Sequence, residues 1–176
     1  MKQYFSDSEW ATLLQSPTQA ILTVILADKA DPVSFLKETG SAFQILASEL
    51  QRKDISSELV TSVVASLNEI AAQEPLQEEP LFSKQELDLL RTIQNFDSVS
   101  DGQKQAIAHF NQVSTLLVSK VPILKAEEFK QWILALATQV AKAVKEDGMF
   151  RIGGGGISRS ESDALLSIEN ALSLKL

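Results

Sequence analysis

The sequence contains no cysteine, a single histidine and no apolar run that approaches the roughly 18 residues of a membrane span. Without cysteine the chain can form no disulfide, no thiolate metal site and no thiol nucleophile. The lone His109 excludes a multi-histidine zinc centre. Basic side chains are outnumbered by acidic ones, 16 to 23, and the resulting net charge of −7 disfavours binding to a nucleic-acid backbone. We therefore predict no nucleic-acid partner and no bound cofactor.

The remaining composition is that of an ordinary globular protein, with 44% apolar and 22% charged residues in a chain of 176. A chain of this length buries enough surface to fold without disulfides or a structural metal. The first residues lack the charged-then-apolar plan of a secretory signal. We expect a cytoplasmic protein without a membrane span.

Apolar residues recur with helical spacing along the whole chain, and no comparable window alternates with period two. The sequence therefore predicts an all-α fold, a bundle of about eight helices. The predicted helices cover 7–15, 17–29, 32–53, 57–73, 84–98, 101–121, 125–147 and 159–174.

Prolines mark several of these boundaries. Pro17 and Pro32 each follow a capping residue, so each is predicted to occupy the first position of a helix. Pro122 is predicted to end the helix before it. Two further prolines fall within an acidic connector, 74–82, between the sub-halves 1–73 and 83–176. At this length we expect a single domain over 1–176.

Serine residues with a glutamate or glutamine three positions later predict capping boxes at four helix starts. The four pairs are Ser6 with Glu9, Ser83 with Glu86, Ser100 with Gln103, and Ser158 with Glu161.

Two predicted helices are apolar almost all round, over 20–27 and 132–140. A helix without a polar face must be enclosed by others, so these two are expected at the centre of the bundle. Gly40 lies inside a predicted helix, which suggests the close approach of a neighbouring helix.

Recognisable enzyme signatures are missing. No glycine pattern continues into the Lys-Ser/Thr of a phosphate-binding loop, and His109 has no local nucleophile beside it. We interpret His109 as a half-buried or surface helix residue. Whether the protein is an enzyme stays open, with the balance towards a non-enzyme.

One segment, 146–161, departs from the rest because it holds four consecutive glycines among apolar residues. Three interpretations compete: the loop folds back over the bundle, it meets a partner or ligand as a mobile lid, or it binds an anion. The residues predicted to bind a ligand or partner are Phe150, Arg151, Ile152, Gly153, Gly154, Gly155, Gly156 and Arg159. Asp147 and Glu161 are the candidate metal ligands.

The same region resembles an uncharacterised family of bacterial all-helical proteins with an Ala-rich helix, a glycine-rich loop and a closing Ser…Glu helix. The resemblance is carried by 132–145, by 147–150 with the glycine run, and by Ile157-Ser158 with Glu161. It implies an all-α fold and no particular activity. Asp147-Gly148 and Ser158-x-x-Glu161 are also similar to the tellurite-resistance TerB-like helical proteins.

These observations predict a non-enzymatic helical protein that binds a protein partner or forms a homodimer, through an exposed apolar groove or the loop 148–158. The alternative is a small-ligand or metal-binding TerB-like stress-response domain that uses the loop 147–161.

Overall fold

The computed structural model describes residues 1–27, 32–72, 99–146 and 157–173. These residues form a short 3-10 helix, η1 (Lys2–Tyr4), and six α-helices, with no strand among them. The α-helices are α1 (Asp7–Ile25), α2 (Pro32–Leu50), α3 (Glu58–Ala72), α5 (Val99–Lys120), α6 (Ile123–Glu146) and α7 (Arg159–Ala171). The all-α prediction is confirmed. The predicted connector 74–82 and helix 84–98 lie outside the described residues, and the count of eight helices is not confirmed.

The predicted break at Ser16-Pro17 is wrong, because α1 runs through Pro17 without interruption. Proline has no N–H to donate to the carbonyl of Leu13, a defect that costs about 3 kcal/mol in a helix interior. Leu13, Ser16, Pro17 and Ala20 are nevertheless all buried. Burial on both sides of the proline therefore outweighs the local cost and keeps the two segments in one helix.

The capping boxes predicted at the starts of α1 and α7 are confirmed. At α1 the Ser6 N–H donates to Glu9 Oε2 at 2.7 Å, and the Glu9 N–H donates to Ser6 Oγ at 3.3 Å. The box predicted for Ser100 is wrong, because α5 already begins at Val99. Gln103 instead donates through Nε2 to the Leu26 carbonyl at 3.0 Å, tying α5 to the end of α1.

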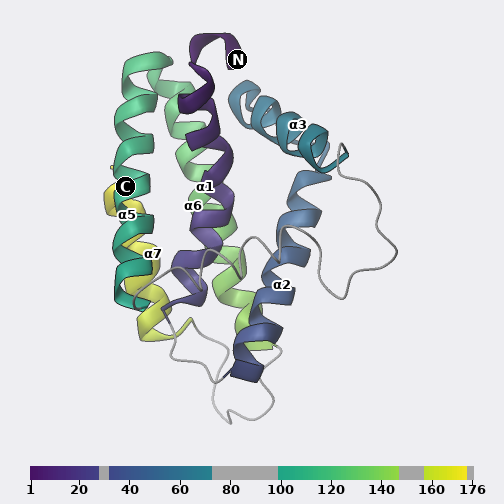
Figure 1. The fold of residues 1–176 in the computed structure, drawn as a ribbon, viewed down its shortest axis with the longest axis vertical. Coiled ribbons are helices and arrows are strands. Elements are labelled where there is room, and N and C mark those ends of the chain that lie inside the picture. The colour runs from purple at the N-terminus through teal and green to yellow at the C-terminus, as the bar shows by residue number, and fades with distance from the viewer. Residues whose placement is uncertain (28–31, 73–98, 147–156, 174–176) are drawn as a thin grey trace.

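The two apolar helices occupy the centre of the bundle, as predicted. α1 and α6 contact each other and each of the other described α-helices. Figure 1 shows α5 and α7 on one side of this pair and α2 and α3 on the other. The core takes large side chains from both sub-halves, including Leu13, Ile21, Leu59, Phe110 and Ile133.

The expectation of a close helix approach at Gly40 is wrong. Among the residues that the structure describes, a methyl group at this position would meet no heavy atom of a neighbouring element within 4 Å. The buried face of α2 instead passes through Thr39, Phe43, Leu46 and Leu50. Gly40 therefore lies to one side of this face, about 100° of helix rotation from Thr39 and about 60° from Phe43.

None of the helices in the described ranges is long and apolar enough to cross a membrane.

Candidate functional site

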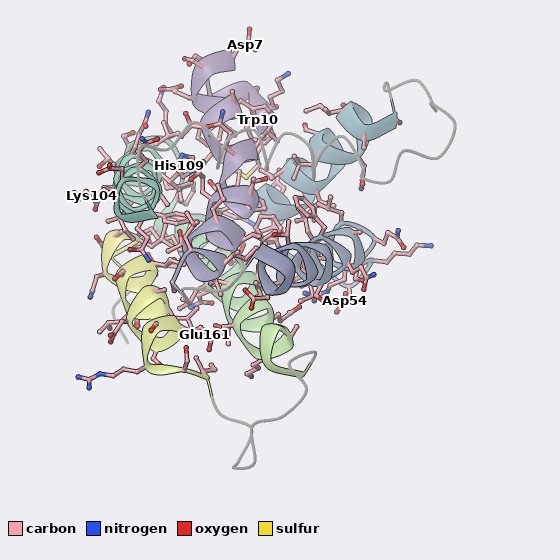
Figure 2. The ribbon with its side chains drawn as sticks, turned by 60° about the horizontal axis from the view of Figure 1, so that its bottom comes forward. Asp7, Trp10, Asp54, Lys104, His109 and Glu161 are labelled. Atoms are coloured by element: carbon pink, nitrogen blue, oxygen red, sulfur yellow. The ribbon has the colours of Figure 1, made fainter. Side chains whose placement is uncertain are left out.

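Most of the predicted loop residues, namely Asp147, Phe150, Arg151, Ile152 and Gly153 to Gly156, lie outside the described residues. Arg159 and Glu161 lie within them, at the start of α7 (Figure 2 labels Glu161). Arg159 is exposed, whereas Glu161 is buried. The structure thus gives the two residues different environments although they are two positions apart.

Glu161 completes the capping box of α7. Its Oε2 accepts from the Ser158 N–H at 2.6 Å, and its own N–H donates to Ser158 Oγ at 3.1 Å. This arrangement places a carboxylate at the positive end of a helix, where it is stabilising. Over the part of the chain that the structure describes, no three His, Cys, Asp or Glu side chains cluster as a metal site would require. The metal site at Asp147 and Glu161 stays a prediction.

The structure brings together a serine and the single histidine, which lie 93 residues apart in the sequence. Ser16 Oγ on α1 lies 3.2 Å from His109 Nε2 on α5, and the Phe110 ring meets the imidazole edge-on. Burial lowers the pKa of His109 to about 4, so the ring is neutral near pH 7. Ser16 is fully buried, so no substrate can reach its hydroxyl. We interpret the pair as a packing contact between α1 and α5.

A second polar cluster joins α2 to α6. The buried Glu49 accepts at Oε1 from Trp132 Nε1 at 2.7 Å and from the Arg52 guanidinium at 2.8 Å. Arg52 also donates two hydrogen bonds of 2.9 Å to the Asp54 carboxylate, and these bonds lower the pKa of the Asp54 carboxyl. The adjoining hollow between the two helices is about 560 Å³ in volume and wide open to solvent. Because the buried carboxylate already has two donors, the cluster acts as a clamp between helices.

A larger and more apolar groove lies where α5 turns into α6, with a volume of about 810 Å³. We call it the α5/α6 groove. One wall consists of Ser114, Thr115 and Val118 of α5, with Val121 in the turn that follows α5. Its α6 wall consists of Ile123, Ala126, Glu127 and Lys130. Ser173 closes one end of the groove.

Three large apolar side chains at this corner are open to solvent. Val118 is 71% exposed, Ile123 80% and Leu124 66%. The predicted helix began only at residue 125, but α6 begins directly after Pro122, whose carbonyl accepts from the N–H groups of Lys125 and Ala126. Ile123 and Leu124 therefore project from the first turn of a helix.

The sequence did hold one signal for this surface that the prediction missed. The buried stripe of α5 runs through Ala106, Phe110, Val113 and Leu117, as its spacing predicts. Val118 is one position off that stripe, so a large apolar side chain stands on a face that should be polar.

Charged side chains near the groove are paired with one another. Lys130 is only 3% exposed, and its Nζ lies 3.1 Å from Glu127 Oε1. The Glu127 side chain is 33% exposed, so solvent reaches the carboxylate rather than the ammonium. Lys120 pairs with Glu9 at 3.1 Å. Of the two charged residues that line the groove, Glu127 is the one whose charge solvent reaches.

No family model, curated protein or solved structure matches the chain. The resemblances stated above stay predictions, and the function has to be argued from the geometry of the molecule.

Proposed function

We propose that this protein is a non-catalytic helical module that binds another protein through the α5/α6 groove. The observation that carries the proposal is the exposure of Val118, Ile123 and Leu124 beside a groove of about 810 Å³. Large apolar side chains gathered at one exposed corner are typical of an interaction surface. Single exposed residues elsewhere, such as Leu166, do not line this groove and need no explanation.

The polar clusters described above support catalysis less well than the exposed apolar corner supports partner binding. Ser16 is inaccessible, and the Glu49 carboxylate is already occupied by Trp132 and Arg52. The pairing of each group within the bundle supports a structural role. A surface that buries apolar area against a partner is the better account of what the molecule presents to solvent.

The proposal is tested with a library of displayed helical peptides selected against the full chain. We expect the selected peptides to lose binding to a Val118→Ser, Ile123→Ser double variant and to retain it with Leu166→Ser. Leu166 is a matched control because it is 53% exposed and does not line the groove. Binding that survives in the double variant would contradict the proposal.

Thermal stability supplies the second measurement. Substitutions of exposed apolar residues change the free energy of unfolding by about 0.5 kcal/mol or less. We therefore expect the double variant to melt close to the original protein. A large loss of stability would mean that the chain itself covers Val118 and Ile123, and the proposal would fail.

A further inference from the structure

Helix α7 packs against a surface formed by α5 and α6, which we call the α7 seat. The α5/α6 groove continues this surface beyond the end of α7. Near the start of α7, Ser160 and Asp163 share a hollow with Gln103 and Ile107 of α5. At its end, the Leu172 carbonyl accepts from Ser114 Oγ at 3.1 Å. Thus α7 runs parallel to α5 and stops beside Ser114, as Figure 1 shows from the upper part of α5 extending beyond it.

The helix itself ends at Ala171. Ser173 has a positive φ of 54°, the left-handed conformation that terminates helices. Beyond that point α5 continues from Ser114 to Lys120, about 9 Å or more than one and a half turns. The described part of α7 therefore does not cover α5 over that length.

Both walls of the α5/α6 groove have the spacing that receives a helix. On α5, Ser114 and Val118 are separated by four residues, and Val121 follows three positions later in the turn before α6. On α6, Ile123, Ala126 and Lys130 are separated by three and four. Rows with this spacing form the ridges between which the side chains of a third helix pack.

The charges decide which kind of helix fits. Glu127 offers a partly exposed carboxylate, and Lys130 beneath it is shielded from solvent. The whole chain also carries a net charge of −7, which attracts basic partners and repels acidic ones. A second copy of the chain would bring the same negative charge to the same groove.

We infer that the α5/α6 groove seats a basic amphipathic helix of a partner protein, which prolongs the line of α7 and pairs a Lys or Arg with Glu127. This inference rests on the proposed function and adds the chemistry of the partner to it. The apolar face of the partner helix covers Val118 and Ile123, and its basic face meets the carboxylate.

The test uses two synthetic stapled helical peptides with the same leucine stripe, one with lysines and one with glutamates on the polar face. Their dissociation constants are measured by fluorescence anisotropy with the full chain. We expect the lysine peptide to bind at least about tenfold more tightly, with a preference that shrinks at high salt. A matched variant, Glu127→Gln with Lys130→Met, removes the carboxylate but keeps the net charge at −7. We expect this variant to lose the preference and to keep leucine-dependent binding.

Glu69→Gln provides the charge control, since Glu69 is an exposed residue of α3 away from the groove. An equal loss of preference in this variant would show a non-specific attraction to an acidic protein and overturn the inference. Equal binding of the two peptides, abolished by Val118→Ser with Ile123→Ser, would overturn the inference but leave the proposed function standing. If neither peptide binds at millimolar concentration, both fail.

Two other results would assign the α5/α6 groove to a different occupant. A concentration-dependent dimer in analytical ultracentrifugation, lost in the Val118→Ser, Ile123→Ser variant, would assign the groove to a second copy of the chain. Binding to phosphatidylcholine and phosphatidylserine vesicles, lost in the same variant, would assign it to a lipid surface. Either result would overturn the inference.

Discussion

Because His109 is buried beside Ser16, we predict that His109 makes the protein less stable in mild acid. In the folded state burial lowers the pKa of His109 from 6.5 to about 4. In the unfolded chain the imidazole is hydrated and takes up a proton at its ordinary pKa of about 6.5. Between these two values the unfolded state binds more protons than the folded state, so stability falls as the pH falls.

The size of the effect follows from the two pKa values. Above pH 7 the imidazole is neutral in both states, and its contribution is fully present. At pH 5 the unfolded state gains about 2 kcal/mol from protonation of His109, and below pH 4 the loss levels off at about 3 kcal/mol. His109→Gln removes this term because glutamine does not titrate, and its amide can still donate to Ser16.

The assay is urea unfolding of both proteins at pH 7.5 and pH 5. Carboxylates also titrate in acid, but they contribute equally to both proteins and cancel in the difference. We expect His109→Gln to gain about 2 kcal/mol relative to the original protein on going from pH 7.5 to pH 5. Because His109 is the only histidine in the chain, its pKa can also be measured by NMR without assignment. A measured pKa near 6.5, or parallel pH profiles for the two proteins, would refute the reasoning.

Four further substitutions test the packing of the bundle and its helix capping by urea unfolding. Gly40→Ala should raise the free energy of unfolding by about 0.5–1 kcal/mol, since a methyl group there meets no neighbour within 4 Å; a loss would show that the site is crowded. Trp132→Phe should cost about 1.5–3 kcal/mol because it removes a donor from the buried Glu49 carboxylate. Trp10→Phe removes a 3.3 Å hydrogen bond to a neutral serine and should lower the free energy of unfolding by less than Trp132→Phe does. A larger loss for Trp10→Phe would contradict the clamp at Glu49. Ser158→Ala should cost about 0.5–2 kcal/mol through the lost cap of α7, and no change would mean that the box is not stabilising.

The features predictable from the sequence are those decided within a few residues of the chain. The capping boxes at Ser6 and Ser158 rest on contacts three positions apart, and both are present. The buried stripe of α5 follows from helical spacing alone, and so does the central place of the two apolar helices. Gly40 shows the limit of the same reasoning, because an error of one position rotates a residue off the packed face.

The candidate surface was less predictable, since exposure depends on which elements fail to cover a side chain. Val118 and Ile123 are exposed in a part of the bundle that α7, which ends beside Ser114, does not reach. Nothing near them in the sequence records where α7 ends in space.

By itself, the sequence determined the helical class, the two central helices and the caps, because periodicity and capping act over one or two turns. The tertiary structure alone decided that Pro17 stays inside α1, where burial exceeds the local cost of a missing hydrogen bond. It also decided the contacts of Ser16 with His109 and of Glu49 with Trp132, pairs 93 and 83 residues apart. Such contacts arise from helix packing, and no local pattern of residues specifies them.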